Sequence, residues 1–364
     1  MSPTLIRWSA LSSEAERTDF LERFARCAED LRAPPYREHA PSVDYTTTVL
    51  RLALLRPSEL FLASANNDVL VRAAVMQCAA RDQTGVLGLY EAAPGPEGDA
   101  ATRVILDMAL AWASSQGMQK LFAPVDLNTW FSYRFLVPHE PGSPPGALHG
   151  WEPTQPPEYI ERFRRHGFEE AEHYQTQVFD FPRSGTYTVR DVVRHTGTAW
   201  HAATEAGFRF QRLDPDDQAD LTALLDELHP LCLEAFRENL LFEPVPIEIF
   251  VGLFRDVLAR PEAKLTHWAR DAEGRLVGFV FAFRQDTKMV VKTVAVAPGA
   301  RGQRLSTALF HLAAKSALEA GIHTFISALV RRDNTSEYLG QAHAMPGVTV
   351  SPREYVLLHR SVRT

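Results

Sequence analysis

Two arginines and two glycines separate a strand-like segment from a helix-like segment in the second half of the chain. Apolar and β-branched residues at 293–296 end before Pro298, and a loop rich in glycine and arginine leads into the helical pattern. Its residues include Gly299, Arg301, Gly302, Gln303, Arg304, Leu305 and Ser306. The first N–H groups of a helix lack partners and carry the positive end of the helix dipole, so they attract anions. Glycines allow close approach of the backbone and arginines add charge, which together predict a binding site for a diphosphate.

An amphipathic helix and a second strand are expected to position this loop. Apolar residues recur with helical spacing at Leu305, Ala308, Leu309, Leu312, Ala313, Ala317 and Ala320. Gly321 stands where a helix commonly ends, residues 323–330 predict a strand, and Asn334 follows. Taken alone, the loop also fits an ordinary capped turn, so the prediction of an anion site depends on the whole assembly.

This assembly resembles the GNAT acetyltransferase superfamily, whose members bind acetyl-coenzyme A. The family pattern is a strand that ends in V-x-V-x-P, then R-G-x-G-x-G/A, then a helix. Residues 294–298 read VAVAP, and Arg301-Gly302 follow. Arg304 and Ser306 replace the next two family glycines. This departure affects how closely the backbone of the loop can approach a ligand, but the loop keeps its positive charge.

The resemblance implies direct transfer of an acetyl group from coenzyme A to an amine, without a metal. The backbone of Val294 and Val296 would hold the pantetheine arm, and the N–H of Val294 or Ala295 would polarise the thioester carbonyl. The loop 301–306 would bind the pyrophosphate. Asn334 matches a family position that contacts the coenzyme.

Such a reaction also needs a proton donor for the departing thiolate and a base for the amine. The family often has a tyrosine seven residues after the asparagine, where this chain has Gln341, so Tyr338 is the candidate acid. A packing role for Tyr338 is an equal alternative. Glu234 and Glu238, four residues apart, predict one helix face that binds a cationic amine or relays its proton. A solvated acidic face is the alternative interpretation of the pair.

The chain contains its own pattern twice, at an almost constant spacing. Pro57 and Pro261 each follow an arginine and precede two strand patterns joined by a polar turn, and they are 204 positions apart. Gly117 and Gly321 repeat this spacing, and Asn128 and Asn334 are 206 positions apart. The repeat predicts an α/β protein of two tandem GNAT-like domains, each with a mixed, mostly antiparallel sheet flanked by helices.

The predicted domains are residues 1–184 and 185–364, with a joint at Ser184-Gly185. The resemblance to the family is clear over 205–364 and fainter over 1–184. In the first domain, residues 97–102 correspond to the cationic loop and read EGDAAT, with Glu97 and an alanine in place of the two arginines and Asp99 nearby. Because like charges repel a diphosphate, only the second domain is expected to bind acetyl-coenzyme A.

Composition limits the other possibilities. The chain has 364 residues, a formal net charge of −7 and a pI of about 6.0, without a long basic run, which argues against a nucleic-acid partner. Three scattered cysteines, Cys27, Cys78 and Cys232, lack metal or disulfide spacing. No apolar run is long enough for a membrane span and no secretion signal is evident, so we expect a cytoplasmic protein that acts alone or as a homodimer.

Two proline-containing segments are expected to shape the surroundings of a site. Residues 135–159 contain seven prolines together with Phe135, Trp151 and Tyr159, which predicts an ordered excursion that caps a pocket, or a surface flap. Pro244 and Pro246 are expected to stop a helix and to form a bend beside the acceptor site.

The predicted function is that of an acetyl-coenzyme A-dependent N-acyltransferase. It would act on a small amine through a ternary complex formed by the second domain. The alternative is a non-catalytic tandem module that binds an acyl-coenzyme A or a protein partner. The replaced loop glycines and the missing tyrosine at 341 favour that alternative.

Overall fold

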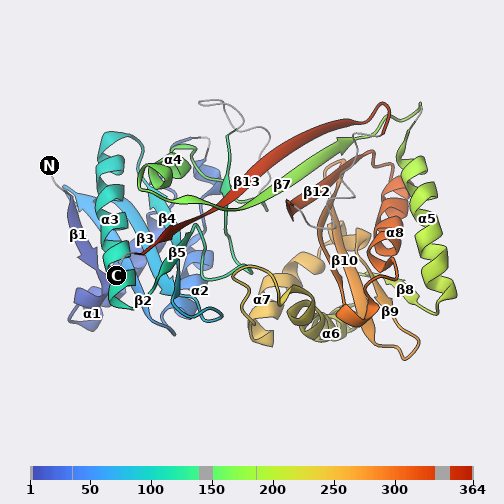
Figure 1. Cartoon of the computed structure of the whole chain (residues 1–364), viewed down its shortest axis with the longest axis horizontal. Coiled ribbons are helices and arrows are strands. Elements are labelled where there is room, and N and C mark those ends of the chain that lie inside the picture. The colour runs from blue at the N-terminus through green and yellow to red at the C-terminus, as the bar shows by residue number, and fades with distance from the viewer. Residues whose placement is uncertain (1–2, 35, 139–150, 186, 333–344, 363–364) are drawn as a thin grey trace. The chain divides into compact units, whose positions relative to one another are not determined.

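The computed structural model describes residues 3–34, 36–138, 151–185, 187–332 and 345–362. These residues form two compact units, each with its own sheet and helices (Figure 1). Unit 1 comprises Met1–Tyr174, Leu240–Glu243 and Glu354–Thr364. Unit 2 comprises Gln175–Asn239 and Pro244–Arg353.

Unit 1 has a mixed sheet in the order β1-β2-β3-β4-β5-β13, and β6 also pairs with β13. These neighbouring strands are antiparallel except for the parallel pair β4–β5. The strands are β1 Thr4–Arg7, β2 Ser58–Ala65, β3 Asp68–Gln77, β4 Thr84–Ala92, β5 Lys120–Ala123, β6 Phe135–Leu136 and β13 Thr349–Ser361. The helices are α1 Glu14–Arg26, α2 Val43–Ala53, α3 Gly95–Ser115 and α4 Glu158–Arg165.

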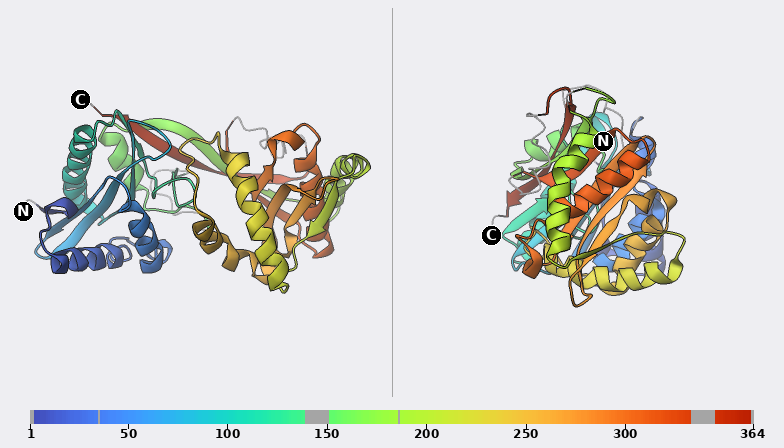
Figure 2. Two further views of the ribbon diagram at one scale, coloured as in Figure 1. Left: turned by 90° about the horizontal axis from the view of Figure 1, so that it is seen from below. Right: turned by 90° about the vertical axis from the view of Figure 1, so that its right-hand side faces the viewer.

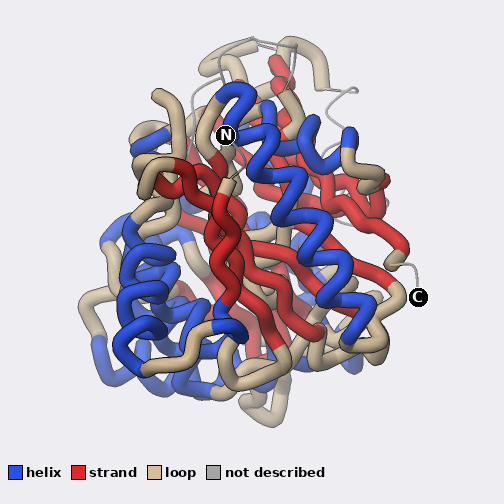
Figure 3. The backbone as a smooth tube through the Cα atoms, turned by 90° about the vertical axis from the view of Figure 1, so that its left-hand side faces the viewer, coloured by secondary structure: helices blue, strands red, loops and turns tan. Residues whose placement is uncertain are grey.

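Helices cover both faces of the unit 1 sheet (Figures 2 and 3). Val71 and Ala73 of β3 belong to the apolar core that includes α3. Arg72 between them points to the other face, because side chains alternate along a strand. Its guanidinium donates to the carbonyl of Phe24 in α1 at 2.6 Å and lies 5.1 Å from the Phe24 ring.

Unit 2 repeats this plan with the strand order β7-β12-β11-β10-β9-β8. Strands β11 and β12 are parallel, whereas the pairs β10–β11, β9–β10 and β8–β9 are antiparallel. The strands are β7 Glu169–Asp180, β8 Arg209–Arg212, β9 His267–Arg270, β10 Leu276–Gln285, β11 Lys288–Val296 and β12 Thr324–Arg331. The helices are α5 Val189–Glu205, α6 Gln218–Phe236, α7 Ile247–Leu258 and α8 Leu305–Glu319. Helices α5 and α8 pack together, and α6 contacts β10 and β11. The predicted fold class is therefore confirmed.

The internal repeat is visible in the register of the strands. The parallel pair begins at Thr84 opposite Lys120 in unit 1 and at Lys288 opposite Thr324 in unit 2. Both positions are again 204 residues apart, and so are the ends of α3 and α8. The polar turns are also as expected, since Asn66 and Asn67 form a two-residue hairpin connection with φ values of 49° and 73°.

The two halves of the sequence exchange their last strands. Strand β7 begins in unit 1, but its residues 175–180 complete the unit 2 sheet beside β12. Strand β13 begins in unit 2, but its residues 354–361 complete unit 1, where Leu358 pairs with Ala123 of β5. For this reason the compact units differ from the predicted division into 1–184 and 185–364.

Two other expectations need correction or restriction. Helix α6 ends at Phe236, so Pro244 and Pro246 do not stop it; Pro246 instead precedes the first turn of α7. In the proline-rich segment, residues 139–150 lie outside the described part of the chain. In the part that is described, the Gln155 amide bonds both the N–H and the carbonyl of Leu136.

Other sequence expectations concern membranes, metals and thiols. In the described residues, no helix is long and apolar enough to cross a membrane, and no group of three or more acidic, histidine or cysteine side chains is arranged to hold a metal ion. The three cysteines are buried and free.

The buried His267 predicts a pH dependence for unit 2. Its ring is 5% exposed, and burial lowers its pKa to about 4. Below the ordinary pKa of 6.5 the unfolded chain takes up a proton that the folded state excludes, so stability falls as the pH falls from 6.5 to about 4. Over this pH window we expect the free energy of unfolding of H267N to fall by about 3 kcal/mol less than that of the wild type. The asparagine keeps a hydrogen-bond donor near the Leu265 carbonyl. Urea unfolding at several pH values measures this difference, and H201N, at an exposed histidine, should retain the wild-type slope.

Candidate functional site

The parallel strands β11 and β12 separate along their length. They pair from Lys288 opposite Thr324 to Val291 opposite Ser327. Among the described residues no further pair joins them, although β11 continues to Val296 and β12 to Arg331. A bulge at Lys292 marks the point of separation, because β10 pairs with Val291 and Thr293 on either side of it. The two strands therefore form a fork, and within the described residues no strand pairs with the fork side of Val294 and Val296.

The backbone of β11 has a defined orientation in this fork. The N–H of Ala297 donates to the Val277 carbonyl of the β10 side at 2.8 Å. Because backbone groups alternate along an antiparallel pair, Ala295 also faces β10, whereas Val294 and Val296 direct their N–H and carbonyl groups toward the fork. Of the two N–H groups considered from the sequence, the geometry favours that of Val294 over that of Ala295.

The loop after β11 leads into α8 without a side-chain cap. A short 3-10 turn at Pro298–Ala300 is followed by Gly302 with φ of 80° and Arg304 with φ of 58°, and α8 begins at Leu305. Only glycine adopts the first of these conformations without cost. Within the described chain, none of the N–H groups from 302 to 307 donates a hydrogen bond. This run of free donors at a helix N-terminus is the arrangement that binds anions.

The two loop arginines differ in their surroundings. Arg301 donates from Nη2 to the carbonyl of Ala235, 3.2 Å away in the last turn of α6. The C-terminal end of a helix carries partial negative charge and favours a cation there. Arg304 is exposed and makes no ion pair with a described residue. The loop thus presents one held guanidinium and one free guanidinium near the unpaired N–H groups.

The corresponding segment of unit 1 has a different structure. Residues 97–102 lie inside α3, which begins at Gly95, six residues earlier than α8 when the spacing of 204 is applied. The carboxylate of Asp99 is paired with Arg162 at 2.7 Å and with Arg165 at 3.2 Å. The added helical turns remove free N–H groups from this position, and two acidic residues, Glu97 and Asp99, lie on these turns.

The fork of unit 1 is also filled by its own carboxylates. Asp126 accepts from the N–H of Leu89 at 2.5 Å and from the Tyr45 hydroxyl at 3.0 Å. Burial raises the pKa of Asp126 to about 6. Asn128 donates to Glu243 at 3.3 Å, and Glu243 is 2% exposed. The positions of unit 1 that correspond to the open fork of unit 2 are therefore already occupied by hydrogen-bonded side chains.

The predicted catalytic residues are only partly placed. Asn334 and Tyr338 fall within 333–344, outside the described residues. Glu234 is an exposed residue of α6, but Glu238 lies beyond the end of this helix at Phe236. The expectation that Glu234 and Glu238 share a helix face is therefore wrong, because the chain turns after Phe236, whose carbonyl accepts from the N–H of Asn239.

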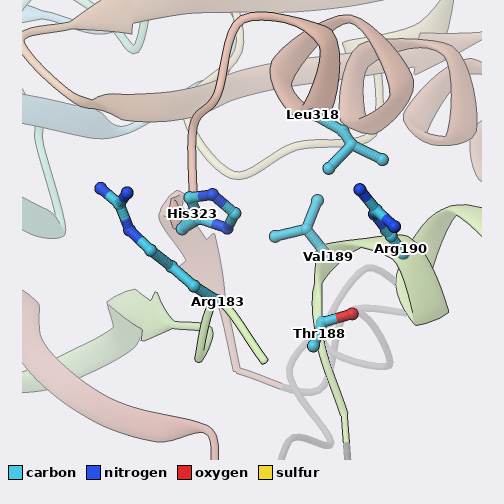
Figure 4. Close-up of a pocket in the computed structure, with 6 residues that line it drawn as sticks. All are labelled: Arg183, Thr188, Val189, Arg190, Leu318 and His323. Carbon is cyan, nitrogen blue, oxygen red and sulfur yellow. The ribbon is translucent and has the colours of Figure 1, made fainter. Parts of the chain in front are cut away.

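Unit 2 has a second cationic region that was not predicted from the sequence. A hollow of about 250 Å³ is lined by Arg183, Thr188, Val189, Arg190, Leu318 and His323 (Figure 4). It lies at the start of α5 and the end of α8. The first turn of α5 is already capped, because Asp191 accepts from both the N–H and the hydroxyl of Thr188. The loop before α8 is therefore the better anion site of the two.

Comparison with protein families identifies one match. Residues 225–337 match the acetyltransferase (GNAT) family. This segment begins within α6 and contains the fork, the cationic loop and α8. No curated protein matches the sequence of the chain.

Solved structures show the same architecture over the full length. A probable N-acyltransferase from Enterococcus faecalis, described as a conserved protein of unknown function, has a TM-score of 0.53 at 11% identity, covering 100% of this chain and 73% of its own. A GCN5-related N-acetyltransferase from Kribbella flavida has a TM-score of 0.50 at 14% identity, covering 99% and 72%. At such identities these two likenesses establish a shared fold.

Proposed function

We propose that unit 2 binds acetyl-coenzyme A and transfers the acetyl group to a small amine, because residues 225–337 match the acetyltransferase (GNAT) family. The observation that carries this proposal is the run of N–H groups from 302 to 307 that donate to no described residue, together with the guanidinium groups of Arg301 and Arg304. A diphosphate satisfies both features at once, because its oxygens accept hydrogen bonds and its charge balances the guanidinium groups.

The fork accounts for the remainder of the cosubstrate. Val294 and Val296 offer N–H and carbonyl groups to the amides of the pantetheine arm, as an added strand would. The N–H of Val294 is the group that polarises the thioester carbonyl. Acetyl-coenzyme A supplies the activated acyl group, so the protein needs no nucleophile of its own and acts by orienting the two substrates.

Proton transfer is assigned to the residues that the sequence suggests for it. Tyr338 remains the proposed acid for the departing thiolate. Glu234 precedes Ala235, the residue whose carbonyl holds Arg301, and remains the proposed carboxylate for a cationic amine. Glu238, after the helix end, is the second acidic residue of this region. A small amine partner, a homodimeric state and a cytoplasmic location also remain proposals.

Unit 1 has a structural role in this proposal. The filled fork at Asp126, the continuous helix over 97–102 and the acidic Glu97 in the first turn of α3 all oppose binding of a second coenzyme. We therefore expect one molecule of acetyl-coenzyme A per chain.

Calorimetric titration and a thiol-release assay test the function together. Acetyl-coenzyme A should bind with a stoichiometry of one, and S-acetylpantetheine, which lacks the nucleotide and the diphosphate, should bind at least about tenfold more weakly. A panel of small amines should then release free thiol. Binding without release for any amine would favour the non-catalytic module, and no binding at all would overturn the proposal.

A further inference from the structure

One face of the unit 2 sheet is already filled beside the fork. Val294 and Val296 of β11 and Val280 of β10 pack against the apolar core that includes α8. A methyl group added at Gly278, opposite Val296, would lie 3.2 Å from Cδ1 of Leu309, so α8 lies directly on the strands here. An acceptor amine therefore reaches a thioester held at the N–H of Val294 from the other face of the sheet, which α6 covers.

Strand β10 presents a row of aromatic rings on this second face. Phe279, Phe281 and Phe283 alternate with Val280 and Ala282, which belong to the core on the α8 side. Because side chains alternate along a strand, the three phenylalanines lie on the opposite face. The ring centroids of Phe281 and Phe283 are 5.4 Å apart. We call these three residues the aromatic wall.

Helix α6 continues the apolar surroundings of the aromatic wall. It contacts β10 and β11, and in this part of the helix Leu231 and Cys232 are buried. Its last turn lies beside the cationic loop, because the Ala235 carbonyl accepts from Arg301. The preceding Glu234 is exposed and meets water. The buried side chains of α6 in this region are therefore uncharged.

The aromatic wall is not covered evenly. Phe281 lies opposite Thr293, the residue that follows the bulge, and is 6% exposed. Thr293 and Phe283 are only half-buried. The wall is therefore closed at Phe281 but accessible at Phe283 and Thr293, next to the N–H of Val294.

We infer that the acceptor is a primary amine with an aromatic side group, such as 2-phenylethylamine, rather than an amine rich in hydroxyl groups. An aromatic ring packs well against the rings of the wall. The hydroxyl groups of an amino sugar would be buried there without hydrogen-bond partners. Apolar surroundings also favour the uncharged amine, which is the nucleophilic form.

The inference rests on the proposed function and specifies its acceptor. The amine nitrogen forms a bond to the acetyl carbon while the carbon–sulfur bond breaks. The nitrogen loses a proton and the departing thiolate gains one, so an amide and free coenzyme A result.

A comparison of three amines tests the inference in the wild type. The thiol-release assay should give 2-phenylethylamine a kcat/KM about thirtyfold above those of ethanolamine and glucosamine, as expected for burial of a phenyl ring. Calorimetric titration of each amine into the protein saturated with coenzyme A should give the same order of affinities in the absence of turnover.

F283L tests the role of the aromatic wall, with F310L as a matched control. Phe310 is a half-buried phenylalanine of α8, and its ring lies 6.3 Å from that of Phe325 in the core on the α8 side. F283L should weaken binding of 2-phenylethylamine about fivefold through loss of ring packing. It should raise KM for this amine, with kcat and the affinity for acetyl-coenzyme A nearly unchanged. F310L should behave as the wild type does, and F283M serves as the test variant if F283L does not fold.

Each outcome has a defined meaning. If the wild type does not bind acetyl-coenzyme A, or binds it and releases no thiol with any amine, the proposed function is overturned and this inference with it. If ethanolamine or glucosamine reacts as readily as 2-phenylethylamine, only the inference is overturned. Equal effects of F283L and F310L on amine binding would also overturn it, because the effect would then reflect general destabilisation of unit 2.

Discussion

R301E/R304E is expected to abolish the stabilisation of unit 2 by acetyl-coenzyme A. At about 100 times its dissociation constant, the ligand should add ~2.7 kcal/mol to the stability of the wild type. For a unit of this size, such a gain raises the melting temperature by roughly 5–10 °C. Two glutamates at the N-terminus of α8 would repel the diphosphate and neutralise the positive end of the helix dipole that attracts it. Differential scanning fluorimetry with and without the ligand measures the loss.

R183E/R190E supplies a charge-matched control for this result. It makes the same change of charge in unit 2, at the hollow between the start of α5 and the end of α8 (Figure 4). The ligand-induced rise in melting temperature should persist in this variant. If R183E/R190E loses the rise and R301E/R304E keeps it, the diphosphate site lies in the hollow and the assignment of the loop is wrong.

L358A is expected to destabilise unit 1, although Leu358 lies in the second half of the sequence. F179A is expected to destabilise unit 2, although Phe179 lies in the first half. Leu358 lies late in the sequence but is 0% exposed in the unit 1 core. Phe179 lies early but is 4% exposed in the unit 2 core. Removing such side chains leaves a cavity and costs about 2–5 kcal/mol for leucine and 3–5 kcal/mol for phenylalanine.

Hydrogen exchange with peptide resolution measures where stability is lost. L358A should increase exchange in β3, β4 and β5, and F179A should increase it in β10, β11 and β12. Acetyl-coenzyme A, which binds only unit 2 in the proposed function, should restore protection in F179A more than in L358A. If L358A instead increases exchange in unit 2 and F179A increases it in unit 1, the strand exchange is incorrect.

The elements set by local patterns could be predicted from the sequence. Helix α8 begins at Leu305, and Gly321 follows its end with a φ of 70°, both as the apolar spacing and the glycine indicate. The hairpin turn at Asn66 and Asn67 follows from residues that tolerate positive φ. These predictions succeed because neighbouring residues determine the backbone conformation.

Features that depend on distant residues could not be predicted in this way. Glu234 and Glu238 have helical spacing, but the helix ends at Phe236. Further along the chain, Glu243 accepts hydrogen bonds from Arg56, Ala79 and Asn128, which are distant in the sequence. A pattern of neighbouring residues does not indicate a hydrogen-bond partner that is distant in the sequence. The strand exchange is likewise invisible, because β7 and β13 have ordinary strand patterns that fit either sheet.

One missed residue did leave a signal in the sequence. Applying the spacing of 204 to Asp126 gives Val330, so an acid in the first half stands where the second half has an apolar residue. A buried carboxylate needs donors, and in the structure these are the Leu89 N–H and the Tyr45 hydroxyl. Comparison of the two halves beyond the loop would have indicated that the first fork is closed.

The crossing of β7 and β13 has a consequence for how such a gene can change. A deletion that removes either half also takes away the final sheet strand of the half that remains, so no simple truncation yields a self-sufficient acetyltransferase domain. Under the proposed function, the half that binds no coenzyme is therefore protected from loss by the folding requirement of the half that binds it. Individual residues of its fork can change, as Asp126 illustrates, while its polypeptide must be kept.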